Sequence, residues 1–254
     1  MEKVKYFERN LKGIDYVVGD LHGCLDEFDL LLQHIGFNFN IDRMFSVGDL
    51  VDRGPHSLKC AKLIRESWFH SVRGNHEQLM IDSLLGEYSQ YNGTYNNWLI
   101  NGGQWSLLED ELDLKEVSKE LDELPLVIVI DKNGKRINIA HAELYRNKNR
   151  DFVTDADIDN WNFDHINENN IIWGRGLIGS KAFNKEINPS LSTTFVGHTP
   201  VEEEIDLLNH RFIDLGACFW HKQRYEKAKL CIVRINDNKS FLLNMKDLVI
   251  TETN

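Results

Sequence analysis

Three short polar motifs, each directly after an apolar run, limit what this chain can fold into. They read Gly-Asp-Leu-His-Gly at 19–23, Gly-Asp-Leu-Val-Asp-Arg-Gly at 48–54 and Gly-Asn-His-Glu at 74–77. Within them, Asp20, Asp49 and Asn75 follow one another at intervals of 29 and 26 residues, a spacing that suits consecutive strand–helix–strand units. Because the carboxyl ends of parallel strands lie along one edge of a sheet, the motifs would deliver their side chains to one place.

The remaining pattern predicts an alternating α/β half followed by a half richer in strands. In the first half, strands are expected at 14–18, 44–47 and 68–72, and helices at 25–35, 56–66 and 77–85. In the second half, strands are expected at 126–130, 136–140, 193–196, 211–214, 230–235, 240–244 and 247–250. Residues 143–170 predict surface loop with one helical turn. We expect the second-half strands to form another, largely antiparallel sheet.

The chain length favours one large domain. With 254 residues, 42% of them hydrophobic, we predict a single domain over 1–254, in which residues 86–124 interrupt the α/β alternation as a helical insert. The aromatic residues of this insert are Tyr88, Tyr91, Tyr95, Trp98 and Trp105. We interpret them as core packing, with a lid over the site as the alternative.

Charge and cysteine content exclude several classes of protein. A net charge of −11 argues against nucleic acid or an anionic membrane as the main partner, so an anionic substrate would need local positive charge. The sequence has neither the apolar core of a signal peptide nor a run of membrane-spanning length. Its four cysteines lack CxxC spacing, which argues against disulfides and structural zinc and fits the reducing cytoplasm. No motif indicates the oligomeric state.

Polar residues at the expected strand ends form a set of nitrogen and oxygen ligands. The set is Asp20, His22, Asp49, Asn75, His141 and His198. Such ligands suit manganese, iron or zinc better than calcium or magnesium. Six ligands exceed the shell of one catalytic ion, so we expect two divalent ions that share one carboxylate, with Asp49 as the candidate bridge. Two ions would lower the pKa of a bridging water, and the hydroxide would attack phosphorus in line.

Five further residues have predicted roles beside the ligands. His76 is the candidate general acid for the leaving group, and Asp52 could hold its other ring nitrogen. Arg53 and Arg175 would bind phosphate oxygens through bidentate guanidinium groups. Arg73 would support the same region without binding the phosphate directly. Structural alternatives stand beside two of these roles, since Asp52 could simply cap a turn and Arg175 could form a surface ion pair.

The three motifs, together with the two downstream histidines, resemble those of the phosphoprotein phosphatase family, and most closely its short bacterial and bacteriophage members. The resemblance implies an α/β fold, a calcineurin-like metallophosphoesterase sandwich of two mixed β-sheets flanked by helices. It also implies two metal positions: one formed by Asp20, His22 and Asp49, the other by Asp49, Asn75, His141 and His198. By the same resemblance His76 and Asp52 form the acid pair, Arg53 and Arg175 bind phosphate, and the metal is manganese, with iron and zinc as alternatives.

One position departs from the family pattern. After the metal-binding histidine the family usually has small residues, whereas this chain has His141-Ala142-Glu143. The Glu143 side chain could change the geometry of that loop or bring a carboxylate close to the substrate.

The resemblance leaves three functions open. The first is a metal-dependent phosphomonoesterase acting on phosphoserine and phosphothreonine, and on phosphotyrosine as a further option, in proteins. The second is a dinucleoside polyphosphate hydrolase. In symmetrical diadenosine tetraphosphate hydrolases the third motif typically ends in aspartate and the second lacks Asp-Arg, whereas here Glu77 and Asp52-Arg53 are present. The third is a phosphopeptide-binding module without turnover, which would be expected to lack a ligand or the acid.

Overall fold

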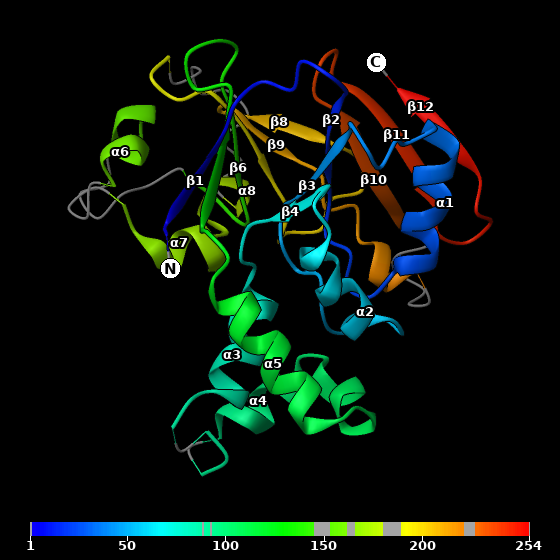
Figure 1. Ribbon diagram of the computed structural model, residues 1–254, viewed down its shortest axis with the longest axis vertical. Coiled ribbons are helices and arrows are strands. Elements are labelled where there is room, and N and C mark those ends of the chain that lie inside the picture. Colours follow the sequence, from blue (N-terminus) through cyan, green and yellow to red (C-terminus); the bar gives the residue numbers. More distant parts are fainter. Residues whose placement is uncertain are drawn as a thin grey trace.

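Two six-stranded β-sheets pack face to face in the computed structural model, and helices cover the outer face of each sheet (Figure 1). The structure describes residues 2–87, 89–91, 93–144, 153–161, 166–179, 189–220 and 227–253. This architecture confirms the predicted sandwich of two mixed sheets flanked by helices. None of the helices in these ranges has both the length and the apolar character needed to cross a bilayer.

The first sheet carries the three polar motifs. Its strands, in spatial order, are β12 (Ile250–Thr253), β11 (Lys239–Asn244), β10 (Lys229–Arg234), β2 (Asp15–Val18), β3 (Arg43–Ser46) and β4 (Phe69–Ser71). The strands β2, β3 and β4 are parallel. Their carboxyl ends therefore lie at one edge of the sheet, where the motifs begin.

The last three strands of the chain join this first sheet, which corrects the expectation that they belong to the second one. β10 pairs antiparallel with β2, with Ile232 opposite Val18, and β11 and β12 extend the sheet outward. All four residues of β2 are buried, so the backbone N–H and C=O groups of this strand need partners on both sides. The C-terminal strands supply the second side.

The second sheet is mixed rather than largely antiparallel. Its strands, in spatial order, are β1 (Val4–Phe7), β5 (Val127–Ile130), β6 (Ile137–Ala140), β7 (Thr193–Val196), β9 (His210–Phe212) and β8 (Ile205–Leu207). β5 and β6 form an antiparallel hairpin, but β1 with β5, β6 with β7, and β7 with β9 are parallel pairs. β1 and β8 are short strands at the two edges of the sheet, and the hydrophobic pattern did not predict them.

The core consists of three layers that follow the alternation of side chains along each strand. In β2, Tyr16 and Val18 face the covering helices, whereas Val17 faces the other sheet. In β5, Ile128 faces the first sheet and Val129 faces the outer helices. Strands buried on both faces explain why the sequence shows continuous apolar runs at these positions.

Helices occupy the outer faces of both sheets (Figure 1). The helical elements outside residues 94–122 are α1 (Leu25–Ile35), α2 (Ser57–Lys62), the 3-10 turn η1 (Leu63–Arg65), α3 (Asn75–Leu84), α6 (Asp155–Asn160), α7 (Glu168–Trp173), α8 (Gly176–Gly179) and the 3-10 turn η3 (Ala217–Phe219). α1 has the predicted bounds, whereas α3 begins two residues earlier than predicted. In the described part of 143–170, helix is more extensive than the expected loop with one helical turn, because Thr154 and Asn167 cap the first turns of α6 and α7. Residues 145–152 and 162–165, on which the rest of that prediction falls, lie outside the described residues.

Residues 94–122 form three helical segments that lie beside α3 and project away from the two sheets (Figure 1). They are α4 (Thr94–Ile100), the 3-10 helix η2 (Gly103–Leu108) and α5 (Glu111–Asp122). Trp98 is fully buried in this region and packs on Tyr95 and Trp105. Tyr88, one of the aromatic residues noted in the sequence, lies outside the described residues. The division into one domain with an insert at 86–124 stays a prediction.

Candidate metal centre

Seven predicted site residues meet at the carboxyl ends of five strands. Asp20 and His22 follow β2, Asp49 follows β3, Asn75 and His76 follow β4, His141 follows β6, and His198 follows β7. All seven side chains are buried. Because β2, β3 and β4 belong to the first sheet and β6 and β7 to the second, the cluster lies where the ends of both sheets meet.

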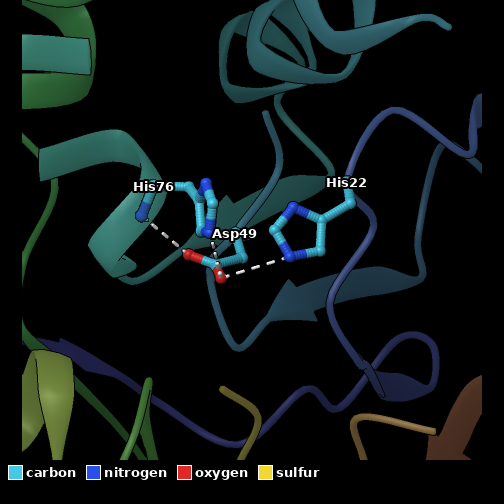
Figure 2. Close-up of side chains that lie close together, drawn as sticks. All are labelled: His22, Asp49 and His76. Atoms are coloured by element: carbon cyan, nitrogen blue, oxygen red, sulfur yellow. Dashed lines mark hydrogen bonds and ion pairs between the residues drawn. The ribbon is translucent and has the colours of Figure 1, made fainter. Parts of the chain in front are cut away.

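The carboxylate of Asp49 lies at the centre of this cluster. Its Oδ2 is 3.3 Å from His22 Nε2, and its Oδ1 is 3.3 Å from His141 Nε2. The backbone N–H of His76 donates to Oδ1 at 3.0 Å. Figure 2 shows the carboxylate directed at the rings of His22 and His76, which come from the loop after β2 and the first turn of α3. Two possible ligand groups share Asp49: His22, Asp49 and His76, and Asp49, His141 and His198.

The imidazoles turn unprotonated nitrogens toward this carboxylate. His22 Nδ1 is 2.7 Å from the carbonyl of Val51, and His141 Nδ1 is 2.8 Å from that of Val47. A carbonyl only accepts, so each Nδ1 carries the proton. Burial lowers the pKa of His22 to about 3 and lowers that of His141 as well, which favours the neutral form of both rings. Their Nε2 lone pairs then face carboxylate oxygens that also only accept, which is the arrangement of donor atoms around a cation.

The charges of the cluster also fit a cation. Burial, reinforced by the negative charges of Asp214 and Asp49, raises the pKa of Asp20 well above its usual range, and burial raises that of Asp214 to about 6. Buried carboxylates this close together need positive charge between them.

The other three candidate ligands reach the cluster in different ways. Asn75 Oδ1 lies 2.9 Å from His141 Nε2 and 2.6 Å from His198 Nδ1, so it joins the second group. Burial lowers the pKa of His198 to about 2, and its Nε2 is buried without a hydrogen-bond partner among the described residues. Asp20 instead accepts the backbone N–H of His198 at 3.0 Å and is not part of either compact group.

His76 and Asp52 form a buried pair beside the cluster. His76 Nδ1 lies 2.6 Å from Asp52 Oδ2, and His76 Nε2 lies 4.0 Å from Asp49 Oδ2. The guanidinium of Arg53 donates to Nε2 of both His22 and His76 and lies over the ring of Phe219. The predicted alternative for Asp52, a simple turn cap, does not describe this arrangement.

Arg175 lies beside His198, in the loop before α8. Its guanidinium donates to the carbonyl of His198 and to Thr199 Oγ1, both at 3.2 Å. Glu143 is buried and accepts the backbone N–H groups of Gly176 at 3.0 Å and Leu177 at 2.7 Å. The side chain that departs from the family pattern therefore holds the loop that carries Arg175, and it does so by hydrogen bonds to the backbone.

The sequence did not reveal the role of Glu77 as an anchor of the motif loops. Its carboxylate accepts the backbone N–H groups of Asp49, Leu50 and Gly74, each at 2.8 Å. Asp49 has a φ of 52°, in the left-handed region where most residues are strained, so the loop needs such support. A Cβ at Gly74 would lie 2.3 Å from Asp49 Oδ1, which explains the glycine there. The sequence signal for this anchoring role is the glutamate that ends the third motif, Gly-Asn-His-Glu.

The fold and the cluster define a class of protein, and the comparisons agree. Residues 16–225 match the family of calcineurin-like phosphoesterases, and the chain belongs to this family. Such enzymes hydrolyse phosphoesters with divalent metal ions, and the two ligand groups described above could hold them.

Among known proteins, the chain is similar to bacterial protein phosphatases over most of its length. It is 33% identical to serine/threonine-protein phosphatase 1 of Salmonella typhimurium, over 80% of this chain and 87% of the relative. It is 30% identical to serine/threonine-protein phosphatase 2 of the same organism, over 85% and 94%. A 73-residue segment, 28% of this chain and 27% of the relative, is 42% identical to the symmetrical bis(5'-nucleosyl)-tetraphosphatase of Haemophilus ducreyi.

Solved structures support the fold. A protein provisionally assigned as a diadenosine tetraphosphatase superposes with a TM-score of 0.63 and 19% identity, covering 100% of this chain and 98% of that one. A serine/threonine phosphatase from Saccharomyces cerevisiae gives a TM-score of 0.61 at 14% identity, covering 99% and 83%. At these identities the likeness is one of fold alone.

Proposed function

We propose that this protein is a metal-dependent phosphomonoesterase that removes phosphate from phosphoserine and phosphothreonine in proteins, with phosphotyrosine as a further substrate. The observation that carries the proposal is the pair of His76 and Asp52, buried against the cluster centred on Asp49. A histidine so placed can protonate the serine or threonine oxygen as it leaves. Without that proton, the alkoxide is a poor leaving group. The similarity to two bacterial serine/threonine phosphatases over most of the chain supports the substrate class.

The proposed metal centre uses the six ligands named from the sequence. Asp20, His22 and Asp49 would hold one divalent ion, and Asp49, Asn75, His141 and His198 the other. Bound ions would activate water for attack on phosphorus and neutralise phosphate oxygens. Manganese suits this mixed nitrogen and oxygen set, with iron and zinc as alternatives.

The remaining steps belong to side chains of this protein. Arg53 lies beside His76 and Arg175 lies beside His198, and both guanidinium groups would bind phosphate oxygens. These two arginines supply the local positive charge that an anionic substrate needs in an acidic protein. Because His76 Nδ1 is held by Asp52, Nε2 is the atom that would carry the proton to the leaving oxygen. Asp52 orients the ring through this bond.

A second candidate function is the hydrolysis of dinucleoside polyphosphates, which the local similarity to symmetrical tetraphosphatases favours. Phosphate release from a phosphoserine peptide and a phosphotyrosine peptide, compared with ADP formation from diadenosine tetraphosphate, all with manganese, separates the two. We expect the phosphoserine peptide to have the highest kcat/KM. Faster cleavage of the nucleotide would overturn the proposed substrate, and binding of the peptide without turnover on any substrate would indicate a phosphopeptide-binding protein.

Glu143 offers a test of how the phosphate-binding loop is held. In Glu143→Gln, the amide NH₂ would face one of two backbone N–H donors, so the loop that carries Arg175 should shift. We expect KM for the phosphoserine peptide to rise about tenfold, equal to about 1.4 kcal/mol, with a smaller change in kcat. Steady-state kinetics measure the split, with the exposed Glu202→Gln as the control. An unchanged KM would contradict this role.

A further inference from the structure

The carboxylate of Asp52 has unusual partners. It is fully buried, and three side-chain N–H groups point at it. His76 Nδ1 lies 2.6 Å from Oδ2, Trp105 Nε1 donates to Oδ1 at 2.8 Å, and Trp98 Nε1 donates to both oxygens at 3.0 and 3.1 Å. The two tryptophans come from the helical segments at 94–108, about 50 residues further along the chain.

These indole groups take the place that a cation usually has beside a buried carboxylate. Among the described residues, no lysine or arginine lies within ion-pair distance of the Asp52 carboxylate. The basic side chain beside it is His76. A buried carboxylate without hydrogen bonds is costly, so its N–H donors determine where it can lie. Both indoles donate to Oδ1, and Oδ2, which also accepts from Trp98, is directed at His76.

The same segment also holds the backbone of Asp52 and Arg53. Both residues are in the left-handed region, with φ of 75° and 71°, and the backbone N–H of Arg53 donates to the carbonyl of Gly102 at 3.0 Å. A Cβ at Gly102 would lie 2.8 Å from Arg53 Cγ. The helical segment therefore fixes both the strained turn and the carboxylate that it carries.

We propose that Trp98 and Trp105 are positioning residues for acid catalysis: their indole N–H groups fix the Asp52 carboxylate so that it orients His76 toward the leaving group. The inference rests on the proposed role of His76. It assigns a catalytic purpose to the aromatic residues of the helical segment, in addition to their place in the core. Removing an indole N–H should impair proton delivery to the leaving group and leave phosphate binding unchanged.

The variants Trp98→Phe and Trp105→Phe test this, because each keeps an aromatic ring and removes the N–H donor. Trp68→Phe is the matched control, since Trp68 is half-buried among Phe37, Phe39 and Phe69. The substrates are alkyl and aryl phosphates whose leaving groups range from poor (phosphoserine peptide, phenyl phosphate) to good (2,4-dinitrophenyl phosphate). A good leaving group departs without a proton, so its hydrolysis does not need His76 as an acid.

We expect Trp105→Phe and Trp98→Phe to lower kcat for poor leaving groups about 10- to 100-fold, a share of the contribution of general acid catalysis. For 2,4-dinitrophenyl phosphate the loss should be less than about threefold, with KM unchanged throughout. An equal loss for all leaving groups would mean that the indoles serve only the structure, and would overturn the inference. Unchanged kcat in both variants would overturn it as well.

A readout apart from activity separates this inference from the proposed function. In ¹⁵N-labelled protein, hydrogen bonds to a carboxylate should move the indole N–H resonances of Trp98 and Trp105 downfield. Asp52→Asn should shift both upfield, because an amide oxygen is a weaker acceptor, while the Trp68 resonance stays in place. If the indole resonances of Trp98 and Trp105 do not shift in Asp52→Asn, the inference is overturned even when the enzyme is active.

If phosphopeptides are not hydrolysed but aryl phosphates are, the proposed substrate fails while the leaving-group series still decides the role of the indoles.

Discussion

Asp49→Asn is expected to abolish metal binding at both proposed positions and, with it, phosphoester hydrolysis. Asp49 is the residue shared by the two possible ligand groups, and each of its two oxygens lies 3.3 Å from a different imidazole. An amide offers one oxygen and carries no charge, so it cannot bridge two cations as a carboxylate does. Metal analysis of the purified variant should find less than about one divalent ion per chain, against about two in the wild type.

The control for this variant is Asp113→Asn, a similar change at an exposed carboxylate on α5. It should keep both its metal and its activity. Thermal unfolding of Asp49→Asn, measured beside it, shows whether the chain still folds. Two ions per chain in a folded Asp49→Asn variant would refute the bridging assignment.

His76→Asn is expected to lower turnover of a phosphoserine peptide by about 10² to 10⁴, the usual share of general acid catalysis, while the metal content stays at the wild-type level. The reason is that His76 faces the cluster through Nε2 while Nδ1 is taken by Asp52. Steady-state kinetics and metal analysis of the same preparation measure both quantities. The exposed His34 provides a His34→Asn control.

The His76→Asn experiment distinguishes between two possible roles of His76, metal ligand and general acid. His76 also belongs to a compact group with His22 and Asp49, in which it could act as a ligand. Loss of metal from His76→Asn would support the ligand role and contradict the acid role. Turnover that falls equally for good and poor leaving groups would contradict the acid role too.

The sequence predicted that the polar motifs would lie together because its signals are local. Each motif directly follows a buried strand, and parallel pairing of β2, β3 and β4 brings their ends together. The bounds of α1 were also predictable, since Gly36 ends the helix in the left-handed conformation at a φ of 64°. Such signals depend on a few neighbouring residues, which a pattern can read.

Pairing between distant segments could not be predicted in this way. Nothing near Ile232 indicates that it lies opposite Val18 in the first sheet, so the C-terminal strands were assigned to the wrong sheet. The bonds from Trp98 and Trp105 to Asp52 likewise join segments that are far apart in sequence. Tryptophan in a core-forming stretch indicates burial, but only the folded chain shows which acceptor its N–H reaches.

The most direct test of the two-metal account is a titration of metal-stripped protein with manganese, in which bound ions and phosphate release from a phosphoserine peptide are measured together. The account predicts no turnover in chelator and a rise in activity that is complete only when about two ions are bound per chain. Turnover that persists in chelator, or full activity with one ion per chain, would contradict it.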